Sequence, residues 1–255
     1  MALEIEQFMC LSDNFGILAR NRETGEAFLV DAPEEGPILA AIERTGWEPK
    51  TLLITHHHPD HVEANLALKE RFGLTIIGPE AEKAKIPGID LTVRGGDAIK
   101  VAGLAVRVID TPGHTLGHVS YHFQKELVVF AADTLFALGC GRLLEGTPAQ
   151  MVSSLAKLAA LPPETRVYCG HEYTQSNASF ALTVDPDNAE LKARAEEIGR
   201  LRAKDKPTLP TTIGLELATN PFLRWADPAI RRTLGMEDAD DVAVFAEIRK
   251  RKDNF

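Results

Sequence analysis

The chain has 255 residues, of which 44% are hydrophobic and 25% charged, and its formal net charge is −9 at pH 7. This composition is typical of a soluble globular protein, and the acidic balance argues against a general nucleic-acid-binding surface. No apolar run approaches the roughly 20 residues that a membrane helix needs, and the N-terminus lacks the pattern of a signal peptide. The three cysteines are scattered and odd in number, which favours a reducing cytoplasm over a disulfide scaffold.

Short apolar runs alternate with helical patterns through the first two thirds of the chain. The apolar runs predict strands at 16–20, 27–33, 51–55, 74–78, 102–110, 118–123, 127–133 and 166–170. Helical spacing predicts helices at 37–46, 62–73 and 147–161. Gly46 and Gly73 stand where helix C-terminal caps are expected, and Thr147 followed by Pro148 is typical of a helix start.

The pattern changes after residue 171. The sequence becomes charged and strongly helical, no strand signal remains, and helices are expected at 188–205, 227–235 and 240–253. We therefore predict an α/β domain at residues 1–171, followed by a helical domain at residues 172–255.

The segment THHHPDHVEAN, residues 55–65, begins where the predicted strand 51–55 ends. Successive side chains of an extended strand point to opposite sides, so the outer two of the three consecutive histidines can share one direction. The spacing H-x-H-x-D-H offers four possible ligands, His56, His58, Asp60 and His61. Imidazole and carboxylate groups are the ligands that zinc and comparable first-row metals prefer. The alternative is a solvated histidine patch; the internal position excludes an expression tag.

Three more polar residues stand where a predicted strand stops. His114 follows a Pro-Gly turn, Asp133 ends an apolar run, and His171 follows the strand at 166–170. A buried acid such as Asp133 needs a partner. An isolated histidine near a core is more often simply hydrogen-bonded, but together with the first cluster these residues make seven ligands.

Seven ligands are too many for one tetrahedral ion and suit two. Two ions about 3.5–4 Å apart share a carboxylate, and Asp133 is the expected bridge. One ion would then be held by His56, His58, His114 and Asp133, and the other by Asp60, His61, His171 and Asp133.

These motifs resemble those of the metallo-β-lactamase superfamily. The resemblance implies a four-layer αββα sandwich, with the metals at one edge of the two sheets and here with a C-terminal helical domain. The superfamily alone does not fix a substrate. Four further segments resemble the glyoxalase II, or hydroxyacylglutathione hydrolase, family over essentially the full length: GCGRLLEGTPAQM, YCGHEYTQSNASFALTVDPDN, PTTIGLELATNPFLR and RKRKDNF.

The glyoxalase II resemblance implies hydrolysis of S-(2-hydroxyacyl)glutathione thioesters, typified by S-D-lactoylglutathione, to D-lactate and glutathione. This is the second step of methylglyoxal detoxification. The resemblance also implies two divalent ions, zinc foremost with iron or manganese as alternatives, and a hydroxide between them as the nucleophile. Asp133 would bridge the ions and Asp60 would help to orient the hydroxide. A thiolate leaving group, whose parent thiol has a pKa near ~8.5, departs without a strong general acid.

The resemblance further implies that the helical domain closes over glutathione. The matching substrate contacts are Arg142, Tyr173, Arg249 and Lys252. The chemistry agrees, because glutathione carries two carboxylates and cationic side chains are their usual partners. A solvated helix end favoured by the helix dipole is the alternative for the basic tail.

The chain departs from the family pattern at three places. Glu63 and Ala64 stand where glycines are usual, Arg142 replaces a lysine, and Leu144 replaces a second tyrosine. These changes leave the metal ligands intact and bear on the affinity for the glutathione moiety.

Two rival functions follow from the same sequence. A mononuclear-iron glutathione persulfide dioxygenase of the same superfamily would bind one iron in place of two ions, and it lacks the long helical part. A non-catalytic glutathione- or metal-binding protein is the rival from another class. A nuclease is disfavoured by the acidic charge. We expect a cytoplasmic monomer that acts on a small thioester and binds neither nucleic acid nor membranes.

The remaining histidines and cysteines receive structural roles. His118 is expected to support a metal ligand, and His57 and His122 to be structural or exposed. Cys140 and Cys169 are expected to be small buried fillers.

Overall fold

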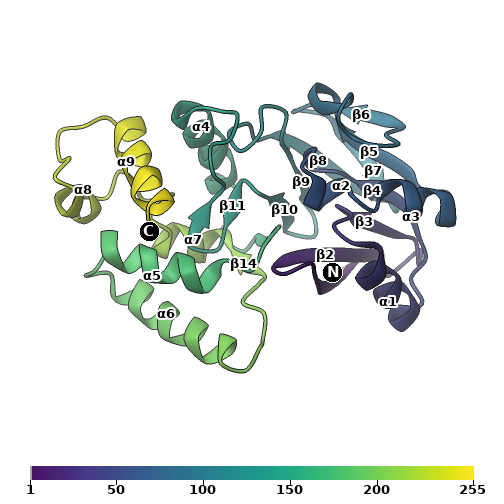
Figure 1. Cartoon of the computed structure of the whole chain (residues 1–255), viewed down its shortest axis with the longest axis horizontal. Helices are drawn as coiled ribbons and strands as arrows, with labels where there is room; N and C mark the ends of the chain where they lie inside the picture. Colours follow the sequence, from purple (N-terminus) through teal and green to yellow (C-terminus); the bar gives the residue numbers. More distant parts are fainter. Residues whose placement is uncertain (1) are drawn as a thin grey trace. The chain divides into compact units, whose positions relative to one another are not determined.

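The computed structural model describes residues 2–255, which fall into two compact units (Figure 1). Unit 1 contains the residues up to Asp110 together with Gly117–Ala131. Unit 2 contains Thr111–Leu116 and Ala132–Phe255.

Unit 1 contains a six-stranded sheet whose strands lie in chain order, from β1 to β6. The strands are β1 Leu3–Cys10, β2 Asn14–Asn21, β3 Ala27–Val30, β4 Pro49–Leu53, β5 Thr75–Pro79 and β6 Leu91–Val93. The first three strands pair antiparallel, whereas β3 to β6 pair in parallel. All four residues of β3 are buried, as expected for a parallel strand that is covered on both faces.

Helices cover one face of this sheet. They are α1 Glu35–Thr45, α2 Pro59–Val62 and α3 Asn65–Phe72, with a 3₁₀ helix η1 at Glu80–Glu82. Ile38 of α1 and Leu68 of α3 share one core with Leu29 and Leu52 of the sheet. The predicted helix at 62–73 corresponds to α3, which begins at Asn65, and Val62 is the last residue of the separate short helix α2.

Glycine closes α1 and α3, as predicted. Gly46 and Gly73 adopt left-handed backbone with φ of 69° and 65°, and their N–H groups bond carbonyls of the preceding turn. A residue without Cβ tolerates this conformation at little cost. The two helices therefore end where the chain must turn back into β4 and β5.

The other face of the sheet packs on a second set of strands in unit 1. These are β7 Ala98–Val101, β8 Leu104–Asp110, β9 Val119–Phe123 and β10 Val128–Ala132, and each pairs antiparallel with the next. Phe28 of β3 stacks on Phe123 of β9 with ring centroids 5.3 Å apart. Phe130 of β10 meets both rings edge-on. The aromatic contacts hold two β layers face to face.

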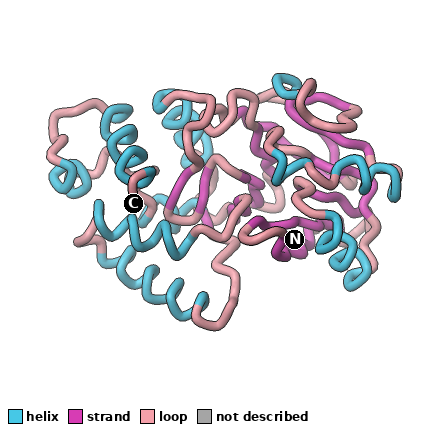
Figure 2. The backbone as a smooth tube through the Cα atoms, viewed as in Figure 1, coloured by secondary structure: helices cyan, strands magenta, loops and turns pink. Residues whose placement is uncertain are grey.

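Unit 2 begins with short strands and continues mainly as helix and loop (Figure 2). Its strands are β11 Leu135–Phe136, β12 Gly139–Cys140, β13 Arg166–Cys169 and β14 Thr211–Thr212. Its helices are α4 Pro148–Ala159, α5 Thr174–Val184, α6 Ala189–Arg202, α7 Ile213–Thr219, α8 Pro228–Leu234 and α9 Asp241–Asp253. The predicted start of α4 is confirmed, since Thr147 and Gln150 form a capping box.

One expectation about this region is wrong. Strand β14 lies beyond residue 171 and pairs antiparallel with β13, with Thr211 opposite Val167. Two threonines are too short a run to show the alternating pattern that predicts a strand. Among residues 2–255, the helices include none with the length and apolar character required to cross a membrane.

Candidate functional site

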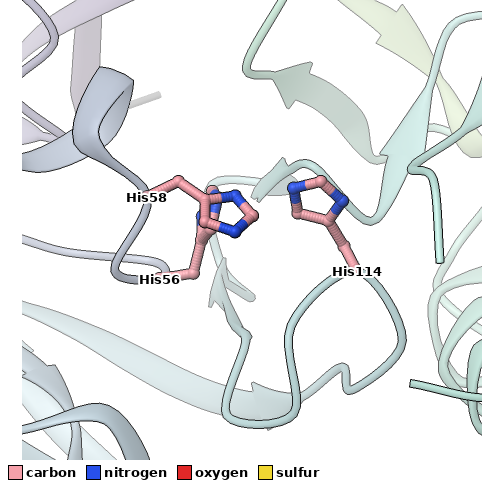
Figure 3. A group of neighbouring side chains, drawn as sticks. All are labelled: His56, His58 and His114. Carbon is pink, nitrogen blue, oxygen red and sulfur yellow. The ribbon is translucent and has the colours of Figure 1, made fainter. Parts of the chain in front are cut away.

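The four predicted ligands of the histidine cluster converge within unit 1. His56 and His58 come from the loop after β4 (Figure 3). Asp60 and His61 lie on α2. Nε2 of His56 lies 3.1 Å from Nδ1 of His58, and the ring centroids of His56 and His61 are 4.1 Å apart. Nε2 of His61 lies 3.6 Å from Oδ2 of Asp60. The loop and the first turn of α2 thus bring imidazole and carboxylate ligands into one cluster.

Two neighbours hold the imidazoles of this cluster from behind. Oδ2 of Asp31 lies 2.8 Å from Nδ1 of His61 and accepts a hydrogen bond of 2.8 Å from the Thr55 hydroxyl. The same hydroxyl lies 3.0 Å from Nδ1 of His56. Occupying Nδ1 fixes the ring orientation and directs Nε2 toward a metal. Asp31 was not singled out in the sequence, although it directly follows the apolar run AFLV.

The other three predicted ligands converge within unit 2. His114 lies on the loop after β8 (Figure 3), Asp133 follows β10, and His171 follows β13. Oδ2 of Asp133 lies 3.3 Å from Nε2 of His114 and 3.3 Å from Nε2 of His171. Nδ1 of His114 bonds the backbone carbonyl of Arg142 at 2.9 Å, so its Nε2 is the nitrogen turned toward the carboxylate.

The donor geometry of both sets fits a first-row metal ion. Zinc–nitrogen bonds are about 2.0–2.1 Å long, so two ligands of a tetrahedral ion lie about 3.3–3.4 Å apart. The contacts of 3.3 Å from Asp133 to two histidines match that spacing, and the 3.1 Å contact between His56 and His58 is slightly shorter. A single carboxylate oxygen between two imidazole nitrogens is also the arrangement that a bridging ligand needs. The chain therefore carries His/Asp clusters that can hold metal ions.

A cavity of about 470 Å³ opens within unit 2 beside His114 and Asp133. It contains all four predicted substrate residues. Its lining is His114, Asp133, Phe136, Cys140, Arg142, Tyr173, Ser176, Asn177, Arg249, Lys252, Asp253 and Phe255. Phe136, Ser176 and Asn177 line the cavity from β11 and α5 and were not predicted from the sequence.

Lys252 on α9 is held at the cavity wall. Its Nζ donates to the backbone carbonyl of Ser176 at 3.2 Å and to the Ser176 hydroxyl at 3.0 Å. The ammonium lies 5.4 Å from the centroid of Phe180 and 5.2 Å from that of Phe255. Burial, reinforced by the positive charges of Arg249 and Arg142, lowers the pKa of Lys252 from 10.5 to about 8.

Arg249 lines the same cavity but is tied to the protein. It is 5% exposed, its Nε and Nη2 contact Oδ1 of Asp253 at 2.9 and 2.8 Å, and its Nη1 donates to the Cys140 carbonyl at 3.0 Å. Phe222 lies beneath the guanidinium, 5.0 Å from ring centroid to Cζ. With five N–H groups, the guanidinium retains donors beyond these contacts.

Tyr173 joins the cavity to the predicted metal ligand His171. Its ring stacks on His171 with centroids 4.6 Å apart and an interplanar angle of 4°. Phe136 meets both rings edge-on. Tyr173 is 38% exposed, so its hydroxyl can face a bound molecule while its ring braces the histidine.

The cysteines are buried, as expected for fillers. All three are free, and burial raises the pKa of the Cys140 thiol to about 11. The pKa of the Cys169 thiol is raised further by the same cause. A thiol of such high pKa is a poor nucleophile at neutral pH.

The three histidines outside the predicted ligand set, His57, His118 and His122, all contact or pack against other residues of the fold. His118 stacks on His56 with ring centroids 4.8 Å apart. Nδ1 of His57 lies 2.9 Å from Oε2 of Glu82. His122 is buried in β9, and desolvation lowers its pKa.

Comparison with known proteins matches the whole chain. Residues 17–171 match the model of the metallo-beta-lactamase superfamily, and residues 172–255 match that of the hydroxyacylglutathione hydrolase C-terminus. A hydroxyacylglutathione hydrolase of Mesorhizobium japonicum is 68% identical over 255 residues, which is 100% of both chains. The chain belongs to the hydroxyacylglutathione hydrolase family. This confirms the family and the fold class predicted from the sequence.

Two further comparisons extend this result. A hydroxyacylglutathione hydrolase of a Chelativorans species is 67% identical over 100% of both chains. The crystal structure of ETHE1 from Myxococcus xanthus superposes with a TM-score of 0.62 at 28% identity, over 86% of this chain and 97% of that one. Membership of the hydroxyacylglutathione hydrolase family thus rests on full-length relatives and not on the fold alone.

Proposed function

We propose that this hydroxyacylglutathione hydrolase acts on S-(2-hydroxyacyl)glutathione thioesters, and on S-D-lactoylglutathione in particular. The observation that carries the proposal is the cavity of unit 2, whose wall holds two metal ligands beside three cationic side chains. Such a wall suits a thioester whose peptide part is anionic and whose carbonyl must reach a Lewis acid. Hydrolysis of S-D-lactoylglutathione gives D-lactate and glutathione, the second step of methylglyoxal detoxification.

The two ligand sets are proposed to act together on two divalent ions, zinc foremost and iron or manganese as alternatives. His56, His58 and His114 would hold one ion, Asp60, His61 and His171 the other, with Asp133 common to both. The grouping is supported by three sets of side chains with metal-binding composition: His56, His58, His114; His56, His61, Asp133; and Asp60, His61, His171. The contacts of Asp133 Oδ2 with two histidines support its bridging role.

When bound, such ions lower the pKa of water and polarise a carbonyl oxygen. The residues of the chain prepare the rest of the reaction. Asp133, and Asp60 beside His61, place carboxylates where a nucleophilic water must be oriented. Water adds to the thioester carbonyl carbon, the C–S bond breaks, and the sulfur leaves as a thiolate that needs no strong acid.

The cationic residues are proposed to bind the glutathione part. Lys252 and Arg142 would meet its carboxylates, and the Tyr173 hydroxyl would donate a hydrogen bond. Arg249 would act through its charge and its free N–H groups, because Asp253 and Cys140 already occupy part of its guanidinium.

Several finer points belong to the same proposal. The catalytic domain would end at residue 171 and the glutathione-binding domain would begin at residue 172, which agrees with the limits of the two family matches. We propose a cytoplasmic monomer: three free cysteines support a reducing compartment, and one chain supplies every proposed ligand. No contact with nucleic acid or a membrane is proposed.

The test is turnover of S-D-lactoylglutathione together with metal content. The purified chain should carry two ions and hydrolyse the thioester above ~10 per second, which is ordinary enzyme behaviour. Asp133→Ala should remove turnover, whereas Asp238→Ala, which changes an exposed acid, should not. Normal metal content with negligible turnover would overturn the proposed substrate.

The same measurements separate the rivals. A persulfide dioxygenase would contain one iron and consume oxygen with glutathione persulfide. A non-catalytic binding protein would bind glutathione equally well with and without Asp133→Ala. Neither outcome is expected from a chain that matches hydroxyacylglutathione hydrolases over its whole length.

A further inference from the structure

Glu82 is a buried carboxylate outside the proposed ligand set. It closes the 3₁₀ helix η1 and is 4% exposed. Its Oε2 accepts a hydrogen bond of 2.7 Å from the backbone N–H of His57 and lies 2.9 Å from Nδ1 of the same residue. Its Oε1 accepts a hydrogen bond of 2.9 Å from the backbone N–H of Gly117. One carboxylate thus connects three segments that are distant in the sequence.

Gly117 is shaped to receive this carboxylate. A Cβ atom at residue 117 would lie 2.5 Å from Cγ of Glu82 and 2.9 Å from its Oε1. Such distances lie well inside van der Waals contact. A side chain at residue 117 would therefore displace the Glu82 carboxylate and break its hydrogen bond with the backbone N–H of Gly117.

The two backbone segments that Glu82 bonds both determine where the imidazole of His56 lies. His57 follows His56 and precedes His58 in the first ligand loop. Gly117 precedes His118, whose ring stacks on His56 with centroids 4.8 Å apart and planes inclined by 29°. Glu82 therefore fixes the loop that carries His56 and the loop that packs against its ring.

A structural filler would not need a buried charge at this place. Burying a carboxylate is costly unless it is paired and hydrogen-bonded. Here the compensation comes from two backbone N–H groups and the His57 imidazole, with Lys85 Nζ 3.4 Å from the far nitrogen of that ring. A hydrogen bond from a backbone N–H to an ionised acceptor is shorter and stronger than one to a neutral acceptor.

We propose that Glu82 is a positioning residue for the metal centre. Glu82 sets the positions of His56 and His58 through its hydrogen bonds to the backbones of His57 and Gly117. The inference rests on the proposed function, because it concerns the ligands of the proposed metal ions. Glu82 is not among the residues that line the cavity of unit 2.

The experiment measures Zn²⁺ affinity in the purified full-length chain by competition with a chromophoric chelator. Glu82→Gln keeps the size of the side chain but turns one acceptor into a donor that faces an N–H group. We expect the Zn²⁺ dissociation constant to rise about 10–100-fold. The KM for S-D-lactoylglutathione at saturating Zn²⁺ should stay within about twofold, because the cavity of unit 2 is unchanged.

Two further variants complete the design. Gly117→Ala keeps the carboxylate and disturbs the same contact from the other side, so it should weaken Zn²⁺ binding in the same direction. Glu80→Gln is the matched control, since Glu80 lies on the same short helix and pairs at the surface with Arg94. It should leave the dissociation constant unchanged.

The outcomes separate this inference from the proposed function. A parent chain that binds no metal would overturn the proposed function, and the inference with it. A parent chain that binds Zn²⁺ normally, with Glu82→Gln and Gly117→Ala within twofold of it, would overturn the inference alone. An increase in KM with unchanged Zn²⁺ affinity would also contradict a positioning role.

Discussion

The carboxylate of Asp31 lies 2.8 Å from Nδ1 of His61, and both side chains are buried. Its other oxygen, Oδ1, accepts a hydrogen bond of 2.8 Å from the backbone N–H of Thr55. Asp31 therefore orients one proposed ligand directly and fixes the chain just before His56. The contact places a negative charge behind His61, which raises the basicity of the opposite ring nitrogen.

Replacing Asp31 by asparagine should weaken metal binding more than it weakens the fold. Asp31→Asn keeps the shape of the side chain and removes the charge behind His61. We expect a loss of about 10–100-fold in Zn²⁺ affinity, measured by chelator competition. Asp238→Asn, which changes an exposed acid, should have no effect. Equal Zn²⁺ affinities for Asp31→Asn and the parent would show that the charge is not needed.

The proposed ligands were predictable because they occupy a recurrent place in the chain, the loop that directly follows a strand. His56, His114 and His171 all stand there, and so does Asp133. Asp31 satisfies the same rule after β3. Its role could have been suspected from the sequence, but a lone acid after a strand has no ligand spacing to mark it.

Glu82 and Glu216 could not have been predicted. Each lies in a polar or helical stretch whose sequence predicts a solvent-exposed surface. Each is buried through contacts with residues that are distant in the sequence. Glu82 meets Gly117, 35 residues away, and Glu216 meets Leu138, 78 residues away. Periodicity describes local structure, whereas these contacts depend on how separate elements pack.

Glu216 is the centre of a buried network in unit 2. Its carboxylate accepts hydrogen bonds from Arg194 at 2.5 Å, Thr211 at 2.6 Å, Leu138 at 2.8 Å and Asn220 at 2.9 Å. Asn220 in turn donates to two carbonyls of the β11–β12 hairpin. The network thus joins α6 and α7 to the hairpin that lines the substrate cavity.

Glu216→Gln should destabilise the chain strongly, because it leaves the largely buried guanidinium of Arg194 without its counter-charge. We expect a loss of about 3 kcal/mol in the free energy of unfolding, or about 6–12 °C in Tm, measured by thermal denaturation. Glu197→Gln breaks an exposed pair with Arg200 and should change stability by less than about 1 kcal/mol. Similar shifts for both variants would contradict the role of burial.

Removing the metal should lower the thermal stability of the chain. A ligand that binds only the folded state stabilises it by about 2.7 kcal/mol at a concentration of 100 times its dissociation constant. A chelator should therefore lower Tm by several degrees, and added Zn²⁺ should restore it. Asp133→Ala should show a much smaller response to both treatments. An unchanged Tm in the parent would argue against binding to the folded chain.

Substrate affinity should fall as pH rises through 8, because Lys252 loses its charge there. Burial and the nearby Arg249 and Arg142 lower the pKa of Lys252 to about 8, while Asp253 opposes the shift. Below this pH the ammonium is available to a glutathione carboxylate, and above it the amine is neutral. We expect the KM for S-D-lactoylglutathione to rise by up to about tenfold between pH 7 and pH 9, because the protonated fraction of a group with a pKa of about 8 falls about tenfold over that range.

Lys252→Arg tests whether this side chain is responsible. A guanidinium stays charged at pH 9, so the variant should keep its KM nearly constant where the KM of the parent rises. Comparing the two chains also removes the contribution of the substrate's own amine, which titrates identically in both assays. A rise of the same size in both would mean that another group controls the pH dependence. A rise of KM in the parent alone would show that the charged Lys252 side chain contributes to binding of the glutathione part of the substrate.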